Sequence, residues 1–459
     1  MYQIDFDHPI SVYFIGIGGI SMSGLAEILL SRGFKISGSD RISSHLTELL
    51  EEKGAVIHYG QRAENITPDI DLVVYTAAIS KDNPEWLAME QLNIPSLSRA
   101  QLLGEIMRNY ELPVAISGTH GKTTTTSMVS EILLHADTDP TLSIGGILKS
   151  IDGNIRVGRS EVFVTEACEY TNSFLEFHPK ISIILNIEED HLDFFKDLNE
   201  IRDSFHRFAA LLPEDGTLII NHEIERFEEI TEGIASPYLT YGFTEDCDYF
   251  ASDISYNELG YPAFVLHAKG HPDTTVTLSV PGRHNISNAM AAIAFSDRVG
   301  IDRADAVKAL SNFTGTERRF EKKGEVAGIT IIDDYAHHPT EIEATLQAAS
   351  NYPHKTLWCV FQPHTYTRTK AFLPEFAKAL SMADKVVLAD IYAAREKNTL
   401  GISSMDLCDA IQKEGTFCKY FPSFDEIENF LLENCTQGDL LITMGAGDIV
   451  KVGERLLGK

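Results

Sequence analysis

The segment Gly118–Thr125 constrains the fold of this chain more than any other, and it reads Gly-Thr-His-Gly-Lys-Thr-Thr-Thr. It follows an apolar run, Leu112–Ile116, and precedes a stretch with helical character, Thr124–Leu134. A strand that leads through a glycine-rich turn into a helix points backbone N–H groups and the positive helix end at one place. We therefore expect an α/β domain whose loop binds the phosphates of a nucleoside triphosphate.

The residue types in this loop suit ATP. Lys122 is expected to lie against the β- and γ-phosphates, and the Thr123 hydroxyl to reach a magnesium ion. The strict Walker pattern has glycine where this chain has Ile116, so the loop is a variant. The alternative is a glycine turn that caps an ordinary helix and leaves Lys122 exposed. We assign ATP binding to Gly118, Thr119, His120, Gly121, Lys122, Thr123 and Thr124.

Length and charge limit the classes of function. A chain of 459 residues is too long for one core, and about three domains are expected. The net charge of −29 argues against binding to nucleic acid or anionic lipid, which require basic surfaces. The first residues lack a signal-peptide pattern, and no apolar run approaches bilayer length. The six cysteines form no C-x-x-C pair, so we expect reduced thiols in a cytoplasmic protein without membrane insertion.

Alternating strand and helix patterns predict three α/β domains, with boundaries at residues 1–110, 111–314 and 315–459. The first begins with a strand, Val12–Ile15, followed by the glycine turn Gly16-Ile17-Gly18-Gly19, and a second strand ends at Ser39 and Asp40. This is a Rossmann-like opening, with Ser21 in place of the third glycine. Three interpretations remain open: a nicotinamide cofactor with Asp40 on a ribose, a simple tight turn, or the diphosphate of another nucleotide.

Polar clusters follow the predicted strands of the second and third domains. Ligands of parallel α/β sheets bind beyond the carboxyl ends of the strands, so these clusters are expected to form one or more sites. They are Glu166-Ala167-Cys168-Glu169, Asn186-Ile187-Glu188-Glu189-Asp190-His191, Asp333-Asp334-Tyr335-Ala336-His337-His338, Gln362-Pro363-His364-Thr365-Tyr366-Thr367-Arg368 and Gly445-Ala446-Gly447-Asp448.

Glu166, Glu169 and His191 are candidate magnesium ligands near the γ-phosphate. A hard cation prefers carboxylate oxygen, which makes Glu169 the better candidate and His191 the less usual one. Each residue alone could instead be a surface acid or a helix cap. Their positions at neighbouring strand ends beside a phosphate loop favour metal binding, and we predict the metal ligands Thr123, Glu169 and His191.

Two further groups of basic side chains are predicted in the third domain. Arg318 and Arg319 lie where it begins, and either a surface pair or an arginine that closes onto ATP would account for them. His337, His338, His364 and Arg368 form a second polar group that suits a small carboxylate substrate with a nearby amine. One of these histidines could simply be a buried residue with satisfied hydrogen bonds.

Taken together, these motifs resemble the Mur ligases over nearly the whole chain and in the same order. The matching segments are Gly16-Ile17-Gly18-Gly19 with Met22-Ser23-Gly24, Gly118–Thr124, Asn186-Ile187-Glu188 with Asp190-His191, Gly282-Arg283-His284-Asn285 with Asn288, Arg318-Arg319-Phe320, Asp333–Glu341, Phe361–His364 and Gly445–Asp448.

The resemblance implies one Rossmann-like domain for a UDP-sugar, a central P-loop ATPase-like domain, and a C-terminal Rossmann-like domain that brings an amino acid. It implies that ATP, with Mg²⁺ or with Mn²⁺ in its place, phosphorylates the carboxylate of UDP-N-acetylmuramate. The amine of L-alanine then attacks the acyl phosphate, which is an early step of peptidoglycan synthesis. A monomer or homodimer is expected.

The resemblance also implies roles for single residues. It adds Asn285, Asn288 and Arg319 to the ATP site, and it places the UDP-sugar on Gly16, Ile17, Gly18, Gly19, Ser39 and Asp40. The amino acid is expected at Tyr335, His337, His364 and Arg368. The implied catalytic residues are Lys122, Glu169, His191, Arg319, His337 and Arg368.

Four features depart from the family pattern. Cys168 replaces an acid, Thr365 replaces an arginine found in some members, and Ser21 replaces a glycine. The segment 199–208 has no lysine, so we expect no carbamylated lysine of the kind some relatives carry there. Three other functions remain open. They are a recycling ligase that attaches a murein tripeptide to the same sugar, an NAD-dependent oxidoreductase, and a P-loop regulatory module that hydrolyses ATP without forming an amide.

Overall fold

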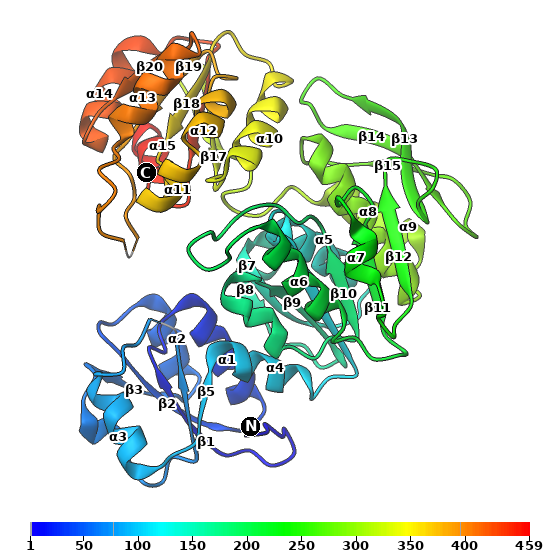
Figure 1. The fold of residues 1–459 in the computed structure, drawn as a ribbon, viewed down its shortest axis with the longest axis vertical. Coiled ribbons are helices and arrows are strands. Elements are labelled where there is room, and N and C mark those ends of the chain that lie inside the picture. Colours follow the sequence, from blue (N-terminus) through cyan, green and yellow to red (C-terminus); the bar gives the residue numbers. More distant parts are fainter. Residues whose placement is uncertain (1, 77, 395) are drawn as a thin grey trace. The chain divides into compact units, whose positions relative to one another are not determined.

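The computed structural model describes residues 2–76, 78–394 and 396–459 and contains three mixed α/β domains, each built on its own sheet (Figure 1). The chain packs into two compact units. The first unit holds Met1–Thr126, Leu133–Glu189 and Asp197–Thr240, and the second holds Ser127–Ile132, Asp190–Lys196 and Tyr241–Lys459. The predicted fold class is confirmed: the first and third domains are Rossmann-like, and the second is built on a larger sheet.

The first sheet has five parallel strands in the order β3-β2-β1-β4-β5. Its central strand β1 is apolar because both of its faces are covered: Val12, Tyr13, Phe14 and Ile15 are fully buried. The elements are β1 Ser11–Ile15, α1 Ile20–Ser31, β2 Lys35–Asp40, α2 His45–Glu52, β3 Val56–Tyr59, η1 Ala63–Asn65, β4 Leu72–Tyr75, α3 Pro84–Leu92, β5 Ser96–Ser98 and α4 Arg99–Met107.

The central sheet has ten strands in the order β15-β14-β13-β12-β11-β10-β6-β9-β7-β8. The strand before the phosphate loop, β6 Leu112–Ser117, lies between β10 Ile181–Ile184 and β9 Val162–Ala167 and is parallel to both. The other elements are α5 Lys122–His135, β7 Thr141–Leu148, η2 Lys149–Ile151, β8 Gly153–Arg156, η3 Tyr170–Glu176, α6 Leu198–Ala209, β11 Thr217–Asn221, α7 Phe227–Thr231, β12 Tyr238–Gly242, β13 Tyr249–Tyr256, β14 Pro262–Ala268, β15 Thr274–Thr277, α8 Arg283–Arg298 and α9 Arg303–Asn312.

The third sheet has six strands in the order β16-β17-β21-β18-β19-β20, with only the edge strand β16 antiparallel. Successive residues of β18 enter two different cores, Cys359 on one face and Trp358 and Val360 on the other. The elements are β16 Glu321–Val326, β17 Ile329–Asp334, α10 Pro339–Ser350, β18 Leu357–Phe361, α11 Tyr366–Ala371, α12 Leu373–Leu380, β19 Lys385–Leu388, α13 Ser404–Lys413, β20 Phe417–Tyr420, α14 Phe424–Asn434, β21 Leu440–Met444 and α15 Val450–Leu456.

Some element ends differ from the sequence-based expectation. Helix α5 begins at Lys122, two residues before the predicted start, so Lys122 and Thr123 belong to its first turn. Strand β17 continues through Asp333 and Asp334, because both residues still pair with β21. Apolar periodicity is weak at such ends, where hydrogen bonds to neighbouring segments decide the boundary.

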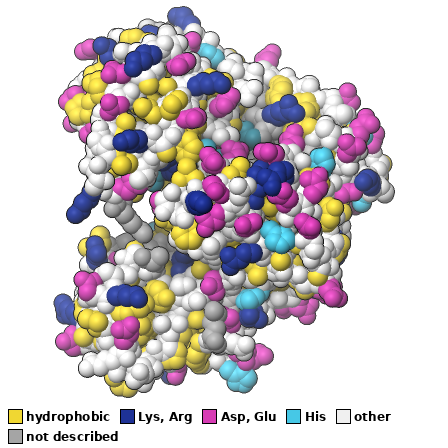
Figure 2. Space-filling model, viewed as in Figure 1, with side chains coloured by type: hydrophobic (Ala, Val, Ile, Leu, Met, Phe, Trp, Pro, Cys, Tyr) yellow, Lys and Arg dark blue, Asp and Glu magenta, His cyan; other side chains and the backbone are white. Residues whose placement is uncertain are grey.

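The surface carries the excess of acid that the composition requires. Figure 2 shows Asp and Glu side chains over much of the visible face, with Lys and Arg among them. Among the described residues, no helix has the length and the apolar character needed to cross a membrane.

Candidate active site

The phosphate loop turns sharply between β6 and α5, and its two glycines make that turn possible. Gly118 has a φ of +145° and Gly121 a φ of +83°, both in the region that favours glycine. A Cβ atom on Gly118 would lie 2.9 Å from the Cβ of Leu185 on the neighbouring segment. Any larger residue there would push the loop away from the sheet.

The segment that follows β10 braces the loop through Asn186. The Asn186 side chain accepts from the His120 N–H at 2.7 Å and donates to the His120 carbonyl at 3.0 Å. The Thr119 N–H donates to the Asn186 carbonyl at 3.1 Å, and the Glu188 N–H donates to the Thr119 hydroxyl at 2.9 Å. These bonds hold the loop in one shape, which lowers the cost of binding phosphate. The site prediction missed Asn186, although its motif was among the matching segments.

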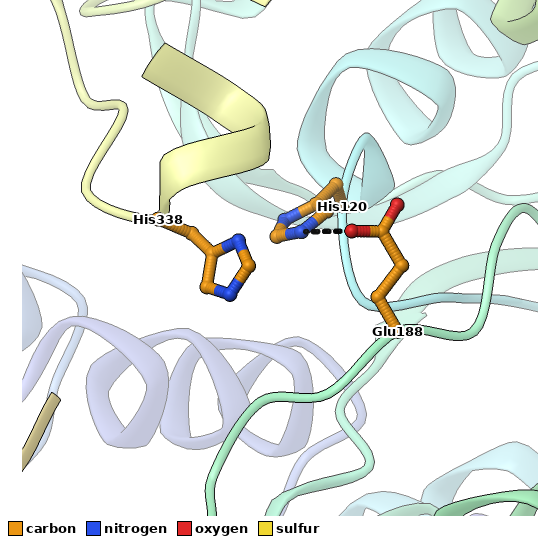
Figure 3. Close-up of side chains that lie close together, drawn as sticks. All are labelled: His120, Glu188 and His338. Atoms are coloured by element: carbon orange, nitrogen blue, oxygen red, sulfur yellow. Dashed lines mark ion pairs between the residues drawn. The ribbon is translucent and has the colours of Figure 1, made fainter. Parts of the chain in front are cut away.

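An ion pair adds to this bracing. Nε2 of His120 lies 3.6 Å from a carboxylate oxygen of Glu188, and Figure 3 shows the two side chains pointing toward each other. His338, drawn in the same view, belongs to the other compact unit, where it caps the start of α10.

Lys122, the first residue of α5, is held in place by the buried carboxylate of Glu169. Its Nζ lies 3.0 Å from a carboxylate oxygen of Glu169 and donates to the Thr119 carbonyl at 3.1 Å. Burial lowers the pKa of Lys122, but the Glu169 carboxylate outweighs this effect and the net pKa is raised. Lys122 is therefore a fixed positive charge at neutral pH. The predicted residues Thr123 and Glu169 are both nearly inaccessible to solvent.

The three candidate metal ligands have different surroundings. Glu166 stands in β9, opposite Ile116 of β6, and accepts a hydrogen bond from the Gly145 N–H at 2.6 Å. Glu169 follows β9 in the same compact unit. His191 belongs to the second unit, so its partnership with Glu169 stays a prediction.

The glycine turn of the first domain is in contact with Asp40. Gly16 has a φ of +83°, and the Gly18 N–H donates to the Asp40 carboxylate at 2.8 Å. A Cβ on Gly18 would come within 2.7 Å of that carboxylate, so glycine is required there. Asp40 thus lies on the turn and accepts a hydrogen bond from its backbone.

Ser39, also predicted to contact the UDP-sugar, is fully buried. Its hydroxyl donates to the buried carboxylate of Glu85 at 2.6 Å, and Glu85 also accepts from Tyr13 at 2.8 Å and from Asn65 at 2.6 Å. This network connects the end of β2 to β1 and α3. The Ser39 hydroxyl therefore stabilises the strand end that carries Asp40. Sequence reasoning missed Glu85, because only the fold brings its partners together.

In the second unit, a buried ion pair orients Arg368. Its guanidinium donates to Asp190 at 2.7 Å and to Nδ1 of His364 at 3.3 Å. Burial raises the pKa of Asp190, but Arg368 outweighs this and the net pKa lies well below its ordinary value. Asp190 therefore stays ionised at all working pH values and keeps Arg368 in place.

His337 and His364 are both neutral at neutral pH. Burial lowers the pKa of each to about 4, and the rings lie 5.6 Å apart. Nδ1 of His337 lies 3.0 Å from the Tyr335 carbonyl, which can only accept, so Nδ1 carries the proton and Nε2 is the acceptor. In His364 the Arg368 donor faces Nδ1, so Nε2 carries the proton there.

Arg318 and Arg319 have different surroundings. Arg318 has a left-handed φ of +61° and donates to Asp333 at 2.9 Å, to the Gly445 carbonyl at 2.8 Å and to the Gly447 carbonyl at 3.0 Å. Its hydrogen-bonding capacity is largely used within the third domain. Arg319 lies over the Tyr335 ring at 5.3 Å, and its nearest carboxylate oxygen, on Glu341, is 4.0 Å away. This contrast supports Arg319 as the arginine that can contact a ligand.

Asp334 is a residue that the site prediction left out. It is buried, and its carboxylate accepts from the Phe320 N–H at 2.8 Å and from the Ala336 N–H at 2.7 Å. Burial raises the pKa of Asp334 to about 6, although Arg319 and these bonds act in the opposite direction. Asp334 thereby fixes the backbone at Phe320, next to Arg319, and at Ala336, next to Tyr335.

Asn285 and Asn288 lie on the first turns of α8, after Gly282 with its φ of +96°. Asn288 donates to the Asn285 side-chain oxygen at 3.1 Å, and Asn285 donates to the Pro281 carbonyl at 2.7 Å. The two predicted ATP-site residues thus form one connected pair. Burial, reinforced by Arg319, lowers the pKa of the neighbouring His284 to about 4.

Thr365, which departs from the family pattern, occupies a strained backbone position. Its φ is +65° and its ψ is 146°, a region that β-branched residues rarely enter. The Thr365 N–H donates to the Tyr392 carbonyl at 2.9 Å, and the His364 and Tyr392 rings stack 5.7 Å apart. Strain of this kind persists only where the surroundings enforce it.

The neutral His337 gives a testable pH dependence. Its folded-state pKa of about 4 lies below the ordinary value of 6.5, so the unfolded chain binds a proton first as the pH falls. Stability contributed by the neutral ring is therefore lost as the pH falls from 6.5 to 4, by at most about 3 kcal/mol. We expect His337→Gln to flatten the acid limb of thermal midpoint against pH.

Asp334 acts with the opposite sign, because its folded-state pKa of about 6 exceeds its ordinary value. Its contribution is present in both proteins and cancels in the comparison. Equal acid limbs for the wild type and His337→Gln would contradict a buried neutral His337.

Comparisons with known proteins agree with this arrangement. The Mur ligase family, catalytic domain, matches residues 11–111, the Mur ligase middle domain matches 116–296, and the Mur ligase, glutamate ligase domain, matches 318–447. The chain is 60% identical to a UDP-N-acetylmuramate–L-alanine ligase of Agathobacter rectalis and 59% identical to one of Lachnospira eligens, over the full length of all chains.

Solved structures show the same likeness. A UDP-N-acetylmuramate-alanine ligase from Thermotoga maritima matches with a TM-score of 0.80 at 30% identity, over 98% of both chains. A murein peptide ligase from Psychrobacter arcticus matches with a TM-score of 0.70 at 26% identity, also over 98% of both chains. All three domains and the order of their motifs are accounted for: this chain belongs to the Mur ligase family.

Proposed function

We propose that this protein is an ATP-dependent ligase that joins L-alanine to the lactyl carboxylate of UDP-N-acetylmuramate, an early step of peptidoglycan synthesis. The observation that carries the proposal is the 60% identity, over the whole chain, to a ligase named for that reaction. The geometry supports it, because the phosphate loop and the histidine–arginine group supply the phosphoryl-transfer and amine chemistry that the reaction needs.

The reaction has two chemical steps. In the first, a carboxylate oxygen of the sugar substrate attacks the γ-phosphorus of ATP, the bond to the β-γ bridging oxygen breaks, and ADP leaves. In the second, the amine of L-alanine attacks the acyl phosphate, the tetrahedral intermediate expels inorganic phosphate, and the amine gives up a proton. Lys122, held by Glu169, and Arg319 would offset the charge on the transferred phosphoryl group.

Magnesium is proposed at Thr123 and Glu169, with His191 as a further ligand. The hydroxyl and carboxylate oxygens of the first two are the donors that a hard cation prefers, and both side chains are buried in one compact unit beside the loop. The ion would supply charge neutralisation on the phosphate oxygens, and Mn²⁺ would serve in its place. Glu169 would exchange part of its contact with Lys122 for the ion.

The amino acid is proposed to bind at Tyr335, His337, His364 and Arg368. Arg368 offers a guanidinium already oriented by Asp190, which suits the alanine carboxylate. Nε2 of the neutral His337 is a proton acceptor that could take the proton from the attacking amine. The Asn285–Asn288 pair is proposed for the adenine end of ATP.

The UDP-sugar is proposed to bind at the glycine turn Gly16–Gly19 with Asp40. We propose that the UDP-sugar, ATP and amino-acid domains meet near residues 110 and 314. The substrates ATP and UDP-N-acetylmuramate place the reaction in the cytoplasm, and we propose a monomer or homodimer.

Phosphate release decides between this function and the alternatives. With ATP, Mg²⁺ and UDP-N-acetylmuramate present, we expect phosphate release to depend on added L-alanine and an amide product to appear in the mass spectrum. Turnover that depends on a murein tripeptide would instead indicate the reaction of the murein peptide ligases. Turnover that ignores both nucleophiles would indicate an ATP-hydrolysing module and would refute the proposal.

A further inference from the structure

Arg99 occupies an unassigned position at the ligand edge of the first sheet. It is the first residue of α4 and directly follows β5. Because the five strands are parallel, the carboxyl end of β5 lies at the same edge as the glycine turn and Asp40. Nη1 of Arg99 donates to the hydroxyl of Ser21, 3.1 Å away, two residues after the turn.

Among the described residues, Cys168, which directly precedes Glu169, is the one titratable group that affects the pKa of Arg99. Cys168 follows the carboxyl end of β9, and both residues belong to the first compact unit. Burial lowers the pKa of Arg99 and the Cys168 thiol acts in the opposite direction, but a guanidinium stays charged at any working pH.

Arg99 has no acidic partner among residues 2–76, 78–394 and 396–459, because its one hydrogen bond is to the neutral Ser21 hydroxyl. Lys122, in the same compact unit, is by contrast paired with Glu169. A half-buried charge loses part of its hydration energy, and an ion of opposite sign compensates for that loss. In a chain of net charge −29, an unpaired arginine at a ligand edge indicates an anionic ligand.

We propose that Arg99 binds an anionic group of the sugar nucleotide. This inference rests on the proposed function, because that substrate carries two such groups, the diphosphate and the lactyl carboxylate. The hydroxyl of Ser21 orients the guanidinium, and α4, which Ser98 and Gln101 cap at its start, holds its backbone. Arg99 thus lies at the edge of the first sheet that also carries the glycine turn and Asp40.

Calorimetric titration of the full-length protein tests this role. Arg99→Gln keeps a donor for Ser21 and removes the charge, so we expect UDP-N-acetylmuramate to bind about 10- to 100-fold more weakly. Arg99→Lys keeps the charge but lacks the bidentate guanidinium, so we expect an intermediate loss of affinity for UDP-N-acetylmuramate. Arg159→Gln is the matched control: this exposed arginine lies before β9, at the opposite end of that strand, and its variant should bind like the wild type.

UDP-N-acetylglucosamine separates the two anions, because it carries the diphosphate and lacks the lactyl carboxylate. Equal weakening of both ligands in Arg99→Gln would assign Arg99 to the diphosphate. Weakening of UDP-N-acetylmuramate alone would assign it to the carboxylate. Wild-type affinity in a folded Arg99→Gln protein, judged by circular dichroism, would overturn the inference.

A second measurement needs no variant. Phenylglyoxal modifies accessible arginines, and mass spectrometry of the wild-type digest can follow Arg99 with and without UDP-N-acetylmuramate. Protection of Arg99 by the sugar nucleotide is expected, and equal modification would overturn its role. A wild-type protein that binds no UDP-N-acetylmuramate would refute the proposed function itself, which is a different result from normal binding that does not depend on Arg99.

Discussion

Replacing Lys122 with alanine is expected to lower ligase turnover by about a hundredfold or more. A preorganised charge on the transferred phosphoryl group contributes most in the transition state, where negative charge is being redistributed. Lys122 is suited to this role because Glu169 and the loop carbonyls hold it in one place. The measurement is the rate of phosphate release at saturating substrates.

The control for this variant must separate charge from folding, because Lys122→Ala leaves the buried Glu169 without its cation. Lys122→Met with Glu169→Gln removes both charges and should stay inactive while recovering the thermal midpoint. Lys149→Ala, at an exposed lysine in the same compact unit, should keep wild-type turnover. A folded Lys122→Ala protein within tenfold of the wild-type rate would exclude the lysine from the mechanism.

Replacing Arg368 with methionine is expected to lower the free energy of unfolding by about 3 kcal/mol and to raise the KM for L-alanine. The variant leaves Asp190 buried and without its cation, and an uncompensated buried charge costs about 3–5 kcal/mol. Both side chains of the pair are only 10% exposed, so water cannot replace the lost partner. Denaturant unfolding at pH 7 gives the first effect, and initial rates against alanine concentration give the second.

A double-mutant cycle provides the control for this pair. Asp190→Asn combined with Arg368→Met removes both charges and should recover much of the lost stability while KM stays raised. The pKa of Asp190 is lowered in the folded protein, so the stability from this pair is present above its ordinary pKa and is lost as the pH falls below it. A change below about 1 kcal/mol in Arg368→Met would show that the contact contributes little.

Local chemistry explains why several parts of the site could be predicted from the sequence. The Gly118–Thr125 loop and the Gly16–Gly19 turn need glycine at positions with positive φ, and a short segment contains that information. The polar clusters were predictable because parallel strands always present their carboxyl ends at one edge. The contact between Glu169 and Lys122 was not predicted, and it depends on β9 lying beside β6.

Other features depend on contacts between residues far apart in the chain. No local pattern distinguishes Arg318 from Arg319, and only the carbonyls of Gly445 and Gly447, over 120 residues away, show that Arg318 is used structurally. Likewise, no local pattern indicated that the Ser39 hydroxyl donates to the buried carboxylate of Glu85.

The sequence by itself determined the fold class, the three-domain organisation and the glycine-rich turn between β6 and α5, because each rests on periodicity or on short motifs that act through the backbone. Only the tertiary structure decided which charged side chains are paired and which are available to a ligand, as Arg368 with Asp190 and the unpaired Arg99 show. The physical reason is that burial and charge pairing depend on distances between residues far apart in the chain. A single amino-acid sequence does not specify those distances directly.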